Sequence, residues 1–217
     1  MMSAKPYFAI LLALLIGGAP GFAAGIGARP AGAEAVDPVN PESEEKLEPA
    51  IGDPVKSRAQ NLDQLYQRLA ASSDEAETRA LVGQIDQLLL QTDSPAAELL
   101  MNRALTAMND QKQEVAGQVL DKLIELQPRW AEAWNKRATL RFILGDNAGS
   151  MADIAQTLKL EPRHIGAISG LGLILERSGL REESLRAFEN TLVIAPQLTS
   201  AKEAIARLKA AIAGQAL

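Results

Sequence analysis

The chain has 217 residues, of which 47% are hydrophobic and only 4% aromatic, so it is long enough for one sizeable domain or two small ones. Its formal net charge is −5, and it has no basic patch of the kind that neutralises phosphates, which argues against nucleic acid as a partner. The absence of cysteine excludes a disulfide framework, thiolate metal sites and a thiol nucleophile.

The first 23 residues have the pattern of an export signal. Lys5 supplies a positive charge, and residues 7–16 form an unbroken apolar run that ends at small residues. Cleavage after Ala23 would place Gly21 and Ala23 at the two small positions that a signal peptidase requires. The alternative is an uncleaved membrane anchor, because residues 6–28 carry no charge. Both interpretations place the rest of the chain outside the cytoplasm.

Residues 24–56 are rich in Pro, Ala and Glu and show neither a helical nor a strand period. Such a stretch cannot bury enough apolar surface to offset the entropy lost on ordering. We therefore predict a disordered acidic linker, with a partner-binding segment as the alternative.

Two segments that follow, residues 57–71 and 74–92, have apolar residues at helical spacing. Ser72 and Glu75 form a capping box between them. We interpret the two segments as a degenerate helix pair at the N-terminal end of the repeat array described next. The apolar positions are Leu62, Leu65, Tyr66 and Leu69 in the first segment and Leu81, Ile85, Leu88 and Leu89 in the second.

An internal period of 34 residues, marked by Pro128, Pro162 and Pro196, is the strongest pattern in the chain. When segments 97–130, 131–164 and 165–198 are aligned, small residues share two positions and large apolar residues share others. The small residues are Ala104, Ala138 and Gly172 at one position and Ala116, Ser150 and Ser184 at the other. The large apolar residues include Leu100, Trp134 and Ile168, and Leu120, Ile154 and Phe188.

Each shared residue type has a physical role in a pair of packed helices. Small residues let the two helices approach closely, and the large apolar residues fill the space beside them. The proline ends the second helix because it lacks an N–H and disfavours helical geometry in the residue before it. Gly145 and Gly179 supply the left-handed residue that closes a first helix, and Asp146 can cap the helix that follows.

This helix-turn-helix period, with Trp, small, small, large apolar and Pro in that order, resembles the tetratricopeptide-repeat (TPR) family. Residues 131–164 carry the resemblance most clearly. It implies an all-α solenoid of antiparallel helix pairs with a concave groove. Residues 199–213 are predicted to form a capping helix, so the TPR domain would span residues 57–217. The whole pattern is similar to small exported bacterial TPR proteins, which implies the periplasm or, with an uncleaved signal, the periplasmic face of the inner membrane.

The resemblance also implies a binding site for a partner helix or peptide, because the first helix of each TPR repeat lines the groove. The predicted stripe is largely apolar, as in helix-in-groove binding. The alternative is that these residues pack on the N-terminal helices or on the neighbouring repeat. The set of Lys and Asn with which some TPR domains clamp acidic chaperone tails is absent. The nine predicted partner-binding residues are Met101, Leu105, Met108, Asn135, Thr139, Phe142, Ser169, Leu173 and Glu176.

Two pairs of residues depart from the family pattern. Arg137 and Arg141 share one helical face, and they either bind an anion or a peptide carboxylate or pair with acids such as Asp121 or Asp153. Gly166 and Gly170 lie one turn apart, and they either allow close packing on the preceding helix or form a flat groove floor.

No residues with the pattern of a catalytic site stand out. His164 is the only histidine, and we expect it to decorate the turn between repeats together with Arg163. The chain offers no nucleophile–base pair, metal-ligand set or cofactor motif. The sequence therefore predicts a non-catalytic interaction scaffold that needs no cofactor. The alternative function is a structural envelope protein that associates with itself as a homo-oligomer.

Overall fold

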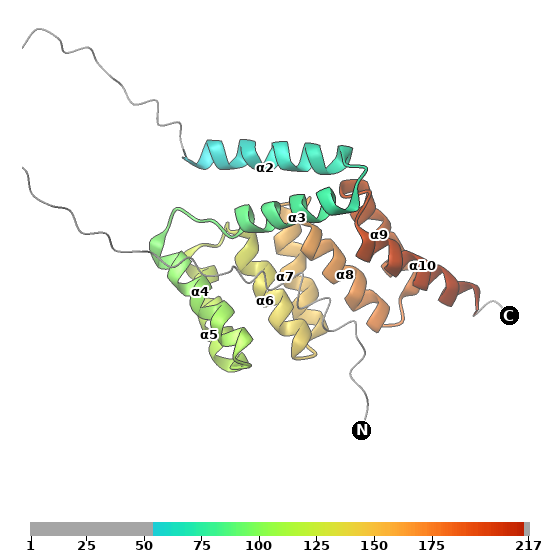
Figure 1. The fold of residues 1–217 in the computed structure, drawn as a ribbon. Helices are drawn as coiled ribbons and strands as arrows, with labels where there is room; N and C mark the ends of the chain where they lie inside the picture. Colours follow the sequence, from blue (N-terminus) through green and yellow to red (C-terminus); the bar gives the residue numbers. More distant parts are fainter. Residues whose placement is uncertain (1–53, 215–217) are drawn as a thin grey trace, which may run out of the picture.

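The computed structural model describes residues 54–214, and within that range the chain forms helices joined by short turns, with no strand (Figure 1). The predicted export signal and nearly all of the predicted linker lie outside the described residues. None of the described helices is long and apolar enough to cross a membrane. The helices are α2 (Pro54–Ala71), α3 (Glu75–Leu89), α4 (Pro95–Asn109), α5 (Gln113–Leu126), α6 (Ala131–Ile143), α7 (Asn147–Leu160), α8 (Ile165–Arg177), α9 (Arg181–Ile194) and α10 (Thr199–Ala213).

The helices α4 to α9 form three pairs that stack side by side, as the period predicts. Helix α4 packs on α5, α6 on α7 and α8 on α9, while α10 covers α9 at the C-terminal end. The all-α solenoid is therefore confirmed. Helix α2 begins at Pro54, slightly before residue 57, where the prediction placed the start of the helical domain.

The small residues of the period bring the two helices of a pair into hydrogen-bonding contact. The hydroxyl of Ser150 donates to the carbonyl oxygen of Ala138 at 2.8 Å, and that of Ser184 donates to Gly172 at 2.7 Å. These two bonds occupy the same register in successive repeats. They tie the second helix directly to the backbone of the first, which only a small side chain allows.

Glycine has a steric role in the third pair. A Cβ atom added to Gly172 would lie 2.7 Å from Cε2 of Phe188, closer than carbon atoms can approach. The predicted turn glycines, Gly145 and Gly179, have φ of 84° and 81°, which confirms their left-handed role. A Cβ atom added to Gly170 would lie 3.7 Å from Cδ1 of Ile154 on the preceding helix, an ordinary contact, so close packing does not require glycine at this position.

The helix pair α2–α3 forms as predicted, but Asp74 caps α3 by accepting from the N–H of Glu77, so the predicted capping box of Ser72 and Glu75 is wrong. The pair also lies elsewhere than an additional N-terminal repeat would. It crosses the ends of the repeat helices instead of stacking on α4 (Figure 1). Its buried residues Leu69, Leu81 and Ile85 belong to one core cluster with Ile165 and Leu208 of α8 and α10. The hairpin α2–α3 therefore packs on the C-terminal part of the array.

The first repeat gives the physical reason for this placement. Leu140 and Ile174 are buried where α6 and α8 meet the preceding repeat, but the equivalent residue of α4 is the exposed Thr106. Leu99 is 70% exposed, while Ala133 at the same register is buried. With the polar Thr106 at this register, the outer face of α4 offers the apolar stripe of α3 less apolar surface than the C-terminal core cluster does.

Candidate functional site: the first-helix face and its polar network

Three of the nine predicted partner-binding residues are buried. Met101, Asn135 and Thr139 are 2%, 3% and 6% exposed. Asn135 and Thr139 line a small internal space together with Gly166 and Gly170 of the next repeat. At these three positions the structure agrees with the alternative interpretation, in which the side chains pack between neighbouring repeats and do not form an exposed surface.

The other six residues are partly buried and lie on α4, α6 and α8: Leu105, Met108, Phe142, Ser169, Leu173 and Glu176. The ring of Phe142 packs against Ile154 and Ile174, with the guanidinium of Arg177 5.5 Å from its centre. Glu176 pairs with Arg207 at 2.8 Å. The accessible face of the first helices, which we call the first-helix face, is thus defined by these six residues. It is narrower than the predicted stripe, and its polar members are Ser169 and Glu176.

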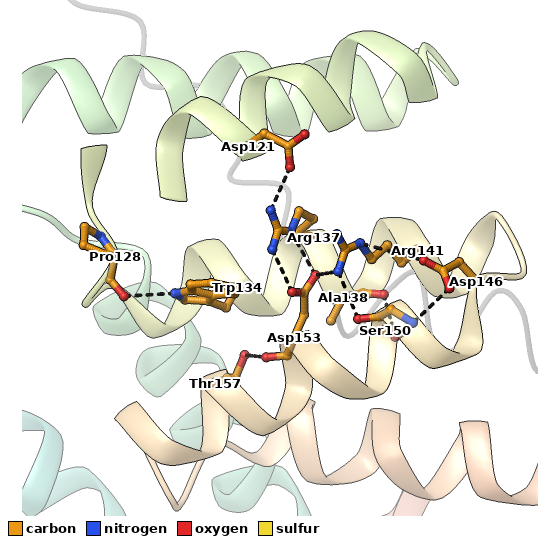
Figure 2. Close-up of polar contacts among 11 residues, drawn as sticks. Asp121, Pro128, Trp134, Arg137, Ala138, Arg141, Asp146, Ser150, Asp153 and Thr157 are labelled. Atoms are coloured by element: carbon orange, nitrogen blue, oxygen red, sulfur yellow. Dashed lines mark hydrogen bonds and ion pairs between the residues drawn. The ribbon is translucent and has the colours of Figure 1, made fainter. Parts of the chain in front are cut away.

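Arg137 and Arg141 pair with acids inside the chain, as the structural alternative predicted. Figure 2 shows the Arg137 guanidinium between Asp121 and Asp153, which it contacts at 2.7 and 2.9 Å. Arg141 contacts the same Asp153 at 2.9 Å and also donates to the carbonyl oxygen of Gly149. Asp153 is 2% exposed, so it neutralises two cations in a nearly water-free setting.

The surroundings of Arg137 hold it in place. Its guanidinium lies 5.0 Å from the ring centre of Trp134, whose indole N–H donates to the carbonyl oxygen of Pro128 at 3.0 Å. The hydrogen bonds that Arg137 donates to Asp153 and Asp121 raise its pKa, so its charge is permanent. Because these contacts take up N–H donors of its guanidinium, Arg137 holds α5, α6 and α7 together and does not form an open anion site.

A second polar cluster, which the sequence analysis missed, surrounds Glu132 at the start of α6. The Glu132 carboxylate contacts Lys136 at 2.7 Å, Nε2 of His164 at 2.7 Å and the Asn135 amide at 3.2 Å. Burial alone would raise the pKa of Glu132, but Lys136 and His164 outweigh that effect and lower it to about 2. Glu132 is therefore a buried carboxylate that stays ionised.

His164 is 2% exposed, which corrects the prediction that it decorates the turn between repeats. Its Nδ1 accepts a hydrogen bond from the backbone N–H of Ala167 at 3.3 Å, so the side chain caps α8 while Nε2 reaches Glu132. The sequence did contain one signal for this cluster, because Glu132 and His164 stand at the starts of two consecutive first helices. The sequence does not show, however, that both residues lie beneath the hairpin α2–α3.

The hairpin meets this region through polar contacts. Arg163 pairs with Asp63 of α2 at 2.7 Å and lies 4.3 Å from the ring centre of Tyr66. The indole N–H of Trp130 donates to the carbonyl oxygen of Leu89 at 2.8 Å. Burial, with the negative charge of Glu132 second, raises the pKa of Asp86 on α3 to about 6. The hairpin thus makes both apolar and charged contacts with the array.

Across residues 54–214, no group of three or more His, Asp or Glu side chains is arranged to hold a metal ion. The two clusters are internally paired, and their geometry suits the fastening of helices to one another. Another molecule would therefore contact the array at its exposed surface and not at these two clusters.

Comparison with known proteins agrees with this architecture. No protein-family model matches the chain. A TPR repeat-containing protein of Rhizobium etli is 37% identical to it over 158 residues, which cover 73% of this chain and 78% of the relative.

Two solved structures are similar in fold. The first TPR domain of Spaghetti, bound to an HSP90 peptide, has a TM-score of 0.53 and 21% identity and covers 56% of this chain and 99% of its own. The protein MamA has a TM-score of 0.52 and 20% identity and covers 65% of this chain and 86% of its own. At these identities the likeness concerns the fold alone.

Proposed function

The chain belongs to the tetratricopeptide-repeat proteins, and from that premise we propose that it is a non-catalytic scaffold that binds a partner helix or peptide in the bacterial periplasm. The observation that carries the proposal is the first-helix face, whose six residues lie on the first helices α4, α6 and α8 and remain partly exposed. Among the described residues, the charged side chains of the two clusters around Glu132 and Asp153 already pair with one another. Recognition of a partner would therefore depend on the shape and the apolar surface of the first-helix face. The solved TPR domain of Spaghetti, which holds a peptide, supports a peptide or protein as the partner class.

The partner would contact the residues of the first-helix face that keep accessible surface. Leu105 and Met108 offer apolar contact on α4, and Ser169 with Leu173 offers a shallow position on α8. Met adapts its shape to varied apolar partners. The chaperone-tail type of recognition is not part of the proposal, because Met101 and Leu105 stand where the clamp would need polar side chains.

The periplasmic location rests on residues 1–23 and their export-signal pattern. Mass spectrometry of the protein purified from its native envelope checks it. An N-terminus at Ala24 in the soluble periplasmic fraction is expected. An intact N-terminus in the membrane fraction would favour the anchored alternative, and recovery from the cytoplasm would contradict the proposal.

A crosslinking pull-down from the native envelope tests the binding face. Ser169→Glu adds bulk and charge to the first-helix face without removing a core side chain, whereas Phe142→Asp would also break a core contact. Ser73→Glu makes the same change on an exposed turn between α2 and α3. Partners captured by wild type and by Ser73→Glu, and lost with Ser169→Glu, are expected. Equal capture by all three proteins would contradict binding at this face.

Self-association is a second candidate, favoured by Leu99. This side chain is 70% exposed at a position where the later repeats bury alanine against a neighbour. A second copy could cover it. Sedimentation velocity over a wide concentration range tests this candidate. A wild-type dimer that Leu99→Ser converts to a monomer would support self-association, and a wild-type monomer at every concentration would contradict it.

A further inference from the structure

A cleft of about 540 Å³ lies between the hairpin α2–α3 and the turns that join the repeats. Leu62, Leu89, Trp130 and Leu160 form its apolar part, while Arg58 and Arg129 are the arginines of its lining. We call it the hairpin cleft. None of the nine predicted partner-binding residues lines it, so it is a surface separate from the first-helix face.

Most charges around the hairpin cleft already have a partner. Arg58 pairs with Asp93 at 2.7 Å, and Glu161 pairs with Arg163 at 3.0 Å. Glu132 is held by Lys136 and His164. Arg129 differs: it is exposed, and no acidic group within residues 54–214 forms an ion pair with it.

The repeat explains why Arg129 lacks an acid. Arg129 and Arg163 occupy the same register, each directly after the proline of its repeat. The two turns have the same backbone hydrogen bond. The N–H of Trp130 donates to the carbonyl oxygen of Gln127 at 3.1 Å, and the N–H of His164 donates to the carbonyl oxygen of Glu161 at 3.1 Å. In the second repeat Glu161 binds Arg163, whereas in the first repeat the neutral Gln127 stands in the place of that acid.

We propose that the hairpin cleft is a second docking surface, for a protein segment in which a large apolar side chain is followed closely by a carboxylate. The apolar side chain would lie against the leucines and Trp130, and the carboxylate would bind Arg129. Charge complementarity carries this choice of partner: an apolar cleft rimmed by a guanidinium without an acid of its own suits a ligand that supplies that acid. A neutral or basic segment would leave Arg129 unpaired at the contact.

Peptide display on the full chain tests the proposal, with a random library as the probe. Wild type is expected to enrich peptides with Leu, Ile, Phe or Trp followed within two residues by Asp or Glu. Arg129→Glu should lose that preference or exchange the acid for Lys or Arg. Arg103→Glu, the same charge reversal on exposed α4 outside the cleft, should select as wild type does. Loss of selection with Arg103→Glu, or unchanged selection with Arg129→Glu, would overturn the proposal.

Fluorescence anisotropy with the leading peptide gives the quantitative test. Arg129→Glu, or amidation of the peptide's carboxylates, should weaken binding by about tenfold or more. Equal affinity for wild type and Arg129→Glu would overturn the assignment. Ser169→Glu should leave this affinity unchanged, which separates the hairpin cleft from the first-helix face. Glu44, Glu45 and Glu48 together changed to Gln should also leave it unchanged; a tenfold gain would show that the chain's own acidic segment occupies the cleft and would overturn the external partner.

Discussion

Asp153 is the residue on which the polar contacts of the second repeat converge. Its carboxylate lies within 2.9 Å of both Arg137 and Arg141, and it is 2% exposed. The two arginines come from α6 and the acid from α7, so the contact joins the two helices of one repeat (Figure 2). A buried acid shared by two cations is costly to lose, because both cations would remain without a partner.

Asp153→Asn should therefore lower the free energy of unfolding by about 3 kcal/mol. Asp121→Asn, which removes the exposed acid on the other side of Arg137, should cost less than about 1 kcal/mol. Urea unfolding followed by circular dichroism measures both values. Equal losses in the two variants would show that Asp153 does not hold the repeat together.

Asp86 makes stability depend on pH. Because burial raises its pKa in the folded protein from 3.8 to about 6, the folded state favours the protonated acid. This contribution to stability is fully present below about pH 4 and is lost as the pH rises through 6. Asp86→Asn should thus stabilise the protein by about 2 kcal/mol at pH 8 and change little at pH 4. Thermal unfolding at the two pH values measures the difference; a variant less stable than wild type at pH 8 would contradict it.

At the scale of elements, the spacing within a helix pair is set by the smallest residues. Gly172 lets Phe188 of α9 approach the backbone of α8, and Ser184 of α9 donates to its carbonyl oxygen. Helix propensity alone favours alanine over glycine in the middle of a helix. The glycine therefore stands where packing outweighs propensity.

A pair of glycine substitutions separates these two effects. Gly172→Ala should destabilise the protein by about 1–3 kcal/mol, because the new methyl group would displace Phe188. Gly83→Ala, on α3 where no atom lies within 4 Å of the added carbon, should stabilise it by about 0.5–1 kcal/mol. Chemical denaturation of both variants is the measurement. A gain in stability for Gly172→Ala would show that the pair has room to spare.

At the scale of the whole molecule, the hairpin α2–α3 changes what kind of solenoid this is. In a simple repeat array each repeat contacts only its neighbours. Here a segment that precedes the first repeat in sequence contacts α9 and shares one core cluster with α8, α9 and α10, and Arg163 reaches Asp63 across 100 positions of the chain. The hairpin therefore couples the stability of the N-terminal segment to that of the C-terminal repeat.

Ile85→Asp should release the hairpin, because it places a charge at a position that is 1% exposed in the shared core. Hydrogen exchange should then show lost protection in α2, α3 and α10, while α4 and α5 keep theirs. Gln84→Asp, on the exposed side of the same helix, serves as the control and should change little. Equal loss of protection in α4 and α5 would show that the array unfolds as a single unit.

The two proposed binding surfaces were harder to predict than the helices. The period located the first helices, and the six residues of the first-helix face lie on them as expected. The period does not record how tightly successive first helices approach, so the sequence offered the burial of Met101, Asn135 and Thr139 as an alternative without deciding in its favour. The contrast between Gln127 and Glu161 was visible in the aligned repeats, but the cleft beside Arg129 exists only because the hairpin lies there.

The sequence by itself determined the helix pairs and their turns, and it offered the pairing of Arg137 with Asp121 and Asp153 as one of two alternatives, between which the structure decided. These features depend on residues within one repeat or two adjacent ones, where spacing in the chain translates directly into spacing in the solenoid. Only the tertiary structure decided where α2 and α3 lie, and with them the burial of His164 and Glu132 and the shape of the hairpin cleft. The physical reason is that an amphipathic pair can pack on any complementary apolar face. The choice among those faces depends on the surface that the whole array presents.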